Sequence, residues 1–80
     1  MIPLYGFLEG DTIGLLVLAD ETDSAAVLVD KLQNSARVRV KARRNMNVVY
    51  KGQVIERTVS VAEARFEALD RFDVVEAKPR

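Results

Sequence analysis

The alternation of apolar and polar residues predicts a β-hairpin at the beginning of the chain. Residues 2–8 and 12–20 are apolar runs of strand length, and a proline is tolerated near the beginning of the first. Glu-Gly-Asp at residues 9–11 is typical of a tight turn between two strands. We therefore expect two antiparallel strands.

The second of these strands has apolar side chains on both faces, because alternate residues of a strand point to opposite sides. One face would carry Ile13, Leu15 and Val17, and the other Leu16 and Leu18. A strand with one face in water alternates apolar and polar residues instead. The second apolar face therefore needs a cover, and a chain of 80 residues does not readily supply one.

Helical periodicity follows a group of capping residues. Thr22, Asp23 and Ser24 are candidate N-caps. The apolar positions that share one helical stripe after them are Ala25, Leu28, Val29 and Leu32. The helix should end between residues 34 and 36.

The second half of the chain returns to strand patterns. Residues 37–44 alternate strictly, as either a half-buried strand or an extended lead-in, and residues 47–55 predict a strand, a turn at 51–52 and a return strand. Residues 60–66 fit one helical turn, and residues 71–77 fit a final strand. Val38, Val40 and Ala42 would lie on one side of residues 37–44 and the bases on the other, and the return strand runs through Val54 and Ile55. The expected inward positions after it are Val61, Ala64, Phe66, Phe72 and Val74 or Val75.

This order of elements predicts an α+β fold of the β-grasp type, a mixed sheet packed on one main helix with a short helical turn before the last strand. Crossovers between parallel strands are right-handed, which places the last strand beside the first and parallel to it. We expect a single domain over residues 1–77 and a short polar tail at residues 78–80. Only one face of the sheet would meet the helix.

The chain resembles the ubiquitin-like superfamily over nearly its whole length. The hairpin has the ubiquitin-like pattern of turn glycine, Thr-Ile pair, alternating aliphatic residues and a threonine before the helix. These are Gly10, Thr12, Ile13, Leu15, Val17 and Thr22. Residues 50–75 resemble the later strand, glycine turn and return of the same superfamily.

Within that superfamily, the chain is similar to the small ubiquitin-like subunit of bacterial toluene monooxygenase systems. The shared features are an Asp-Ser helix start, an acid-Lys-aliphatic segment, a basic alternating stretch and a final Asp-Val-Val strand. Here they are Asp23, Ser24, Asp30, Lys31, Leu32, residues 37–44, Asp73, Val74 and Val75. The resemblance implies an accessory subunit bound to a diiron hydroxylase, with the iron held by the partner.

One position departs from the pattern of that family. Arg65 stands where glycine is usual. If this position needs a positive φ, the arginine is strained by roughly 1 kcal/mol, unless the turn is built differently.

Charge is sorted along the chain, although the formal net charge is zero. Residues 1–30 hold six acidic and no basic residues, and residues 31–51 hold seven basic and no acidic ones. Sorted charge on a neutral protein favours oriented docking to a protein over general attraction to a polyanion. The candidate orienting bases are Arg37, Arg39, Lys41, Arg43 and Arg44. They could equally be the solvated face of an edge strand, and nucleic acid is disfavoured because aromatic residues are not interleaved with them.

Residue types that carry catalysis or bind metals are scarce. The sequence has no cysteine and no histidine, which removes thiolate nucleophiles and the usual general base. Asp20, Glu21 and Asp23 lack the ligand spacing and glycine bend of a calcium loop. We therefore expect no catalytic, cofactor-binding or metal-binding residue. No basic and apolar leader stands at the N-terminus and no run is long enough to cross a bilayer, so we expect a cytoplasmic protein without membrane contact.

The expected function is therefore binding. The open face of the sheet would carry the apolar contacts to a protein partner, namely Tyr5, Phe7, Leu16 and Leu18. The partner we expect is the large hydroxylase subunit of a multicomponent bacterial diiron monooxygenase. The alternative is a ubiquitin-like component of a bacterial secretion or signalling assembly. A sulfur carrier or protein modifier comes third, because the C-terminal Gly-Gly of such proteins is missing. A homo-oligomer would bury the same leucines.

Overall fold

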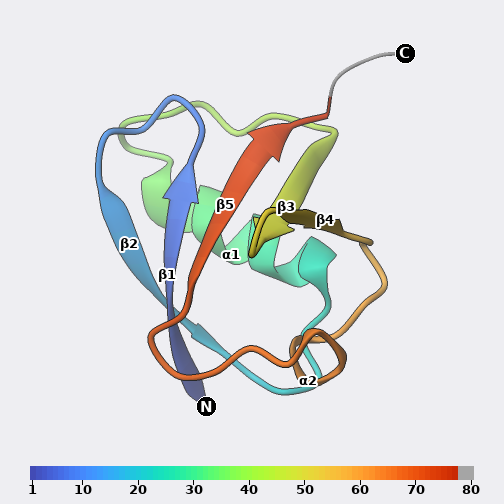
Figure 1. The fold of residues 1–80 in the computed structure, drawn as a ribbon. Helices are drawn as coiled ribbons and strands as arrows, with labels where there is room; N and C mark the ends of the chain where they lie inside the picture. Colours follow the sequence, from blue (N-terminus) through green and yellow to red (C-terminus); the bar gives the residue numbers. More distant parts are fainter. Residues whose placement is uncertain (78–80) are drawn as a thin grey trace.

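The computed structural model describes residues 1–77 (Figure 1). The elements follow in the predicted order: β1 (Ile2–Leu8), β2 (Gly14–Ala19), α1 (Ala25–Ala36), β3 (Met46–Tyr50), β4 (Gln53–Ile55), α2 (Val61–Ala64) and β5 (Arg71–Glu76). The polar tail expected at residues 78–80 lies outside the described residues.

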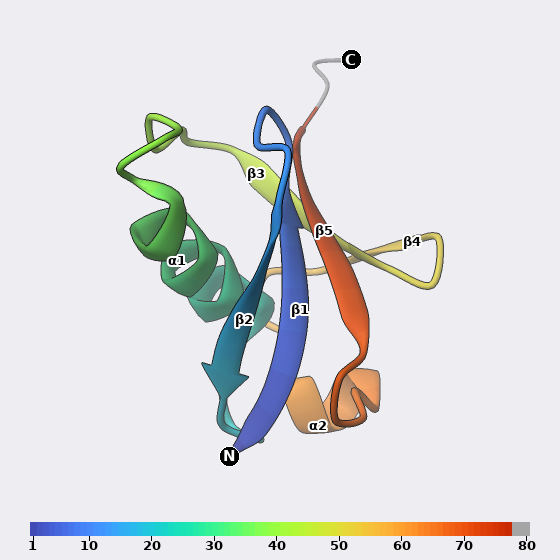
Figure 2. The same cartoon turned by 90° about the vertical axis from the view of Figure 1, so that its left-hand side faces the viewer.

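The strands form one mixed sheet in the order β2-β1-β5-β3-β4. β1 pairs antiparallel with β2 and parallel with β5, which confirms the predicted crossover. β3 lies antiparallel to both β5 and β4. Figure 2 shows α1 crossing one side of the sheet. No element of residues 1–77 crosses the other side in the same way, so the predicted open face is present.

The core lies between α1 and the sheet. Ser24 is the N-cap of α1, because its Oγ accepts a hydrogen bond from the backbone N–H of Val27. The predicted helical stripe is buried. At Gly6 a side chain would not fit between helix and sheet, since a Cβ there would lie 2.8 Å from Cδ1 of Leu32 and 2.9 Å from Cζ of Phe72. The largest fully buried side chains are Phe72, Leu4, Leu28, Leu32, Met46, Val48, Val61 and Val74.

Residues 37–44 are a lead-in to β3, so the alternative of a half-buried strand is wrong. Arg39 and Val40 both donate a backbone N–H to the carbonyl of Ala36, which continues α1 as a turn. Val38 is 84% exposed, Ala42 is also exposed, and only Val40 packs partly against the core. Alternation alone did not place these side chains inward, because no neighbouring strand pairs with this segment.

One further position differs from expectation. Ile13 is exposed and precedes β2, so it does not share the inward face of Leu15 and Val17. It lies in the loop of the hairpin, where the Asp11 side chain accepts a hydrogen bond from the backbone N–H of Thr12. Val54 is also exposed, because it faces the open side of the short edge strand β4 opposite Val49.

Arg65 shows whether the position that is usually glycine in the resembled family needs a positive φ. It ends α2 with φ 62° and ψ 41°, the left-handed region in which glycine is the usual residue. The backbone N–H of Arg65 bonds to the carbonyl of Ala62. The turn therefore has the left-handed conformation that glycine usually adopts at this position, although the residue here is arginine.

Candidate functional site

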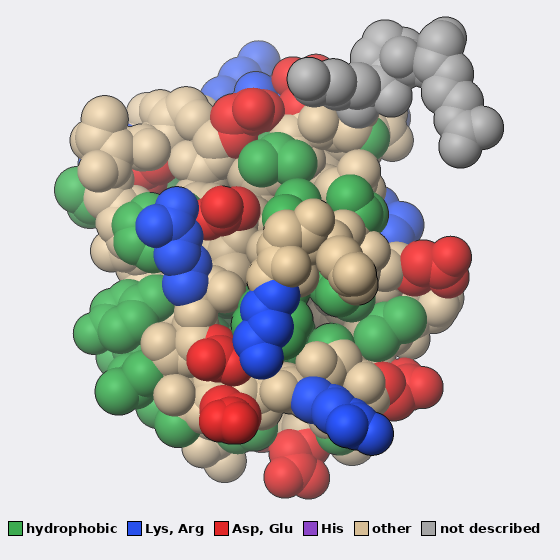
Figure 3. All heavy atoms as spheres, in the orientation of Figure 1, with side chains coloured by type: hydrophobic (Ala, Val, Ile, Leu, Met, Phe, Trp, Pro, Cys, Tyr) green, Lys and Arg blue, Asp and Glu red, His purple; other side chains and the backbone are tan. Residues whose placement is uncertain are grey.

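The open face of the sheet carries an exposed apolar patch at its β2 side. The register sets Tyr5 beside Leu16 and Pro3 beside Leu18 on neighbouring strands. Tyr5, Leu16 and Leu18 are 43%, 54% and 52% exposed. Figure 3 looks onto this face and shows hydrophobic side chains gathered over the β2 edge. We call Tyr5, Leu16 and Leu18 the sheet patch.

Phe7 shares this face but is half-buried, unlike the other three predicted contact residues. The guanidinium carbon of Arg71 lies 4.1 Å from the centroid of the Phe7 ring, a cation–π contact. Gly14 lies against the same ring, since a Cβ on Gly14 would be 2.5 Å from it. Phe7 therefore lies at the border of the sheet patch, where it packs against Arg71 and Gly14.

The other half of the open face is more polar. Asp73 of β5 lies between Phe7 and Val49 in the sheet, and it accepts a hydrogen bond from Arg71. Val49 of β3 and Val75 of β5 also lie on this half of the face, and both are half-buried. Leu69 is exposed near the beginning of β1, where its backbone N–H bonds to the carbonyl of Pro3. No sequence pattern pointed to Leu69, because an isolated leucine in a turn carries no periodic signal.

The predicted orienting bases fall into two groups by their contacts. Arg39 donates two hydrogen bonds to the carboxylate of Asp11, and this contact lowers the pKa of Asp11. Arg43 donates to the backbone carbonyl of Glu9 and to the carboxylate of Glu76. These two arginines therefore tie the lead-in to the hairpin loop and to β5.

The remaining bases of this segment have no such contacts. Arg37, Lys41 and Arg44 are exposed, and they make no ion pair within residues 1–77. Arg44 differs from the other two because it lines a pocket.

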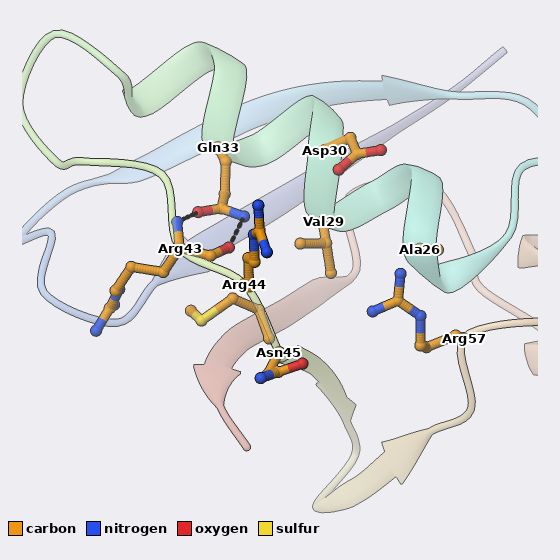
Figure 4. A pocket seen from close by; sticks show the side chains of 9 residues that line it. Ala26, Val29, Asp30, Gln33, Arg43, Arg44, Asn45 and Arg57 are labelled. Carbon is orange, nitrogen blue, oxygen red and sulfur yellow. Dashed lines mark hydrogen bonds between the residues drawn. The ribbon is translucent and has the colours of Figure 1, made fainter. Parts of the chain in front are cut away.

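This pocket, of about 450 Å³, lies on the helix side between α1 and the beginning of β3 (Figure 4). The Gln33 side chain fixes its wall, because it donates to the carbonyl of Arg43 and accepts from the N–H of Arg43. Arg57, which follows β4, lines the opposite side. No sequence pattern groups Arg57 with Arg44, because only the fold brings them to one pocket.

A buried polar contact lies at the far end of β3. The Tyr50 hydroxyl bonds to the carboxylate of Asp70, and the Tyr50 ring stacks on Phe66. Burial, together with Asp70, raises the pKa of Tyr50 to about 12, and the same hydrogen bond lowers the pKa of Asp70. A phenol with so high a pKa is a poor proton donor near neutral pH, which indicates a structural role.

Groups suited to metals are also missing from the described part of the chain. Within residues 1–77 no cluster of three or more carboxylate, histidine or cysteine side chains could hold a metal ion. No helix found there has the length and apolar character needed to cross a membrane.

Comparison with solved structures first defines the class. The ubiquitin of Caldiarchaeum subterraneum matches 98% of this chain and 95% of its own, with a TM-score of 0.75 and 13% identity. A chain of the crystal structure of ATBAG1 in complex with HSP70 matches 95% of this chain and 40% of its own, with a TM-score of 0.77 and 10% identity. The chain therefore has the ubiquitin-like β-grasp fold.

The family follows from two further comparisons. A chain of the toluene 4-monooxygenase HD complex with the inhibitor 4-bromobenzoate matches 95% of this chain and 98% of its own, with a TM-score of 0.87 and 25% identity. The family model of toluene-4-monooxygenase system protein B (TmoB) matches residues 1–75, so the chain belongs to this family. No curated protein sequence matches it.

Proposed function

We propose that this protein is a small accessory subunit of a monooxygenase system, which binds the hydroxylase through the sheet patch and carries out no chemistry itself. Its membership of the system protein B family supports the assignment, as does its similarity to a chain of a toluene 4-monooxygenase complex. The observation that carries the proposal is the exposure of Tyr5, Leu16 and Leu18 on a sheet face that no helix of residues 1–77 covers.

The energetics favour a protein partner for this patch. Fully burying one large aliphatic side chain contributes about 1.5–3 kcal/mol, and about half of each leucine here is still accessible. Two leucines and a tyrosine would therefore supply a few kcal/mol to an interface before the cost of association. Tyrosine adds a rigid ring and a hydroxyl that can remain at the wet rim.

The bases of the lead-in complete the proposed contact set. Arg37 and Lys41 are exposed and would meet acidic groups of the hydroxylase, which speeds and orients docking. Arg39 and Arg43 would act indirectly, since their bonds to Asp11 and Glu76 hold the lead-in in place. Phe7 would contribute its exposed edge beside Tyr5.

The reaction centre belongs, in this proposal, to the partner. The diiron group that the family resemblance implies does not fit this chain, because the sequence offers no histidine and residues 1–77 hold no cluster of carboxylates. The contribution of this subunit is then to stabilise or position the hydroxylase. A cytoplasmic location is part of the same proposal.

The test is the affinity of the double variant Leu16→Ser, Leu18→Ser for the purified hydroxylase lacking this subunit. We expect binding at least about tenfold weaker, because each serine removes over 1 kcal/mol of apolar burial. The matched control is Val38→Ser, Val54→Ser, which removes two exposed apolar side chains elsewhere. Both variants should keep the thermal unfolding of the parent protein. Equal affinities of the two double variants would contradict the proposal.

A further inference from the structure

We propose that the pocket between α1 and β3 binds the carboxylate side chain of an acidic segment on a protein partner. This contact would lie on the helix side of the sheet, away from the sheet patch. Only the identity of the partner rests on the proposed function; the carboxylate site rests on the pocket itself.

The walls of the pocket are fixed by bonds that do not involve a ligand. Gln33 is buried, at 7% exposure, and holds both backbone groups of Arg43 at 3.0 and 2.7 Å. The carbonyl of Asn45 accepts a hydrogen bond from Ala77, and the carbonyl of Arg57 accepts one from Ala26 in the first turn of α1. A preformed frame lowers the entropy lost on binding.

Two arginines face the pocket without a partner of opposite charge. Arg44 and Arg57 form no side-chain hydrogen bond or ion pair within residues 1–77, whereas Arg39, Arg43 and Arg71 each bond to a carboxylate. Figure 4 shows the guanidinium groups of Arg44 and Arg57 on either side of Val29. Two like charges around one hollow favour an anion between them, and guanidinium matches a carboxylate in bidentate geometry.

The other lining residues narrow the class of anion. Asp30 also borders the pocket and makes no ion pair within the described chain. Arg43 lines the pocket too, but its guanidinium is paired with Glu76 and points away from the other lining side chains in Figure 4. The charges of Arg44, Arg57 and Asp30 therefore sum to a single positive charge. A monoanion matches that sum better than a phosphate dianion, which Asp30 would repel. The buried side chains of Val29 and Met46 provide an apolar floor for the methylene groups of a glutamate.

The test is a titration of the isotope-labelled full-length protein by NMR at low salt. The probe is an acetylated and amidated Gly-Glu-Glu-Gly peptide, with Gly-Gln-Gln-Gly as its neutral counterpart. We expect saturable shifts at the amides around Arg44 and Arg57, with a Kd on the order of millimolar, since exposed ion pairs are individually weak. The glutamine peptide should produce no such shifts.

Variants separate this site from general attraction to the basic segment. Arg44→Gln, Arg57→Gln should weaken peptide binding about tenfold, and Asp30→Asn should strengthen it about threefold. The matched control, Arg37→Gln, Lys41→Gln, removes the same charge outside the pocket and should leave the Kd within about twofold. Equal losses in both double variants, or tighter binding of inorganic phosphate than of the peptide, would overturn the proposal.

The sheet-patch variant keeps the two proposals apart. Leu16→Ser, Leu18→Ser should bind the glutamate peptide as the parent does, because the pocket lies on the other side of the sheet. If it does so but also binds the hydroxylase normally, only the proposed function fails. If the peptide fails to bind the parent protein, only the carboxylate site fails.

Discussion

At the scale of the single residue, Arg65 holds a backbone conformation that costs any residue with a Cβ more than it costs glycine. Replacing it by glycine relieves this strain but makes the unfolded chain more flexible. We expect Arg65→Gly to raise the free energy of unfolding by about 0.5–1 kcal/mol, measured by urea denaturation.

The control for this prediction is Arg37→Gly. Arg37 ends α1 with φ −61°, a conformation that arginine adopts without strain. Glycine there should leave stability unchanged or lower it. A loss of stability in Arg65→Gly of the same size as in Arg37→Gly would show that the left-handed arginine is not strained.

The titration of Tyr50 gives a second prediction at this scale. Its pKa rises from 10.0 to about 12 on folding, so the stability due to the neutral phenol is complete below pH 10 and is lost as the pH rises through 12. We expect the free energy of unfolding to fall steeply across this interval. Tyr50→Phe has no phenol to ionise at this position and should lack that part of the fall; an unchanged profile would contradict the assignment.

At the scale of the element, the connection from α1 to β3 depends on one side chain. Gln33 satisfies the N–H and the carbonyl of Arg43, which have no strand partner. Gln33→Leu would leave both groups without these bonds, so we expect a loss of about 1–3 kcal/mol in the free energy of unfolding.

Hydrogen exchange should locate this effect. The amide of Arg43 should exchange faster in Gln33→Leu, because its acceptor is removed. Asn34→Leu is the matched control, since Asn34 is exposed on the same helix and should change neither stability nor exchange at Arg43. An equal effect of the two variants would contradict the role of Gln33.

The elements themselves could largely be predicted from local pattern. The helical stripe from Ala25 to Leu32 and its Ser24 cap depend on neighbours in sequence, and the order of the elements then determines the crossover. The lead-in, residues 37–44, could not be assigned to a strand or a loop from the sequence. Its alternation is the same whether a neighbouring strand or the side chain of Gln33 forms the hydrogen bonds to its backbone. An interior glutamine in a helix sequence gives no sign that it will be buried.

The candidate site divides in the same way. The exposure of Leu16 and Leu18 follows from alternation along one strand once the helix has covered the other face. The shielding of Phe7 by Arg71 depends on the pairing of β1 with β5, which joins residues far apart in sequence. The meeting of Arg44 and Arg57 likewise needs the complete fold.

At the scale of the whole molecule, the two edges of the sheet differ in length and exposure. β2 has six residues, none of them charged, and β4 has only three. Long apolar edges without charges pair with other chains. Lys31 protects part of this edge, because it donates to the carbonyl of Leu18 and to Asp23.

We therefore expect the protein without its partner to self-associate through β2. Leu16→Lys should slow aggregation several-fold in light scattering, while the free energy of unfolding changes by less than about 0.5 kcal/mol. Val54→Lys places the same charge on the β4 edge and should have little effect. Equal slowing by both variants would indicate a general effect of charge.

The central position of β5 in the sheet affects how the chain folds during synthesis. Among the elements of residues 1–77 this strand is synthesised last, and it fills the gap between β1 and β3. Until it emerges, the hairpin and the α1 to β4 segment have no strand to join them into one sheet, and the core lacks the buried side chains of Phe72 and Val74. The complete sheet should therefore form only after Glu76 has emerged from the ribosome, and a nascent chain stalled before β5 emerges should remain open to proteases and chaperones.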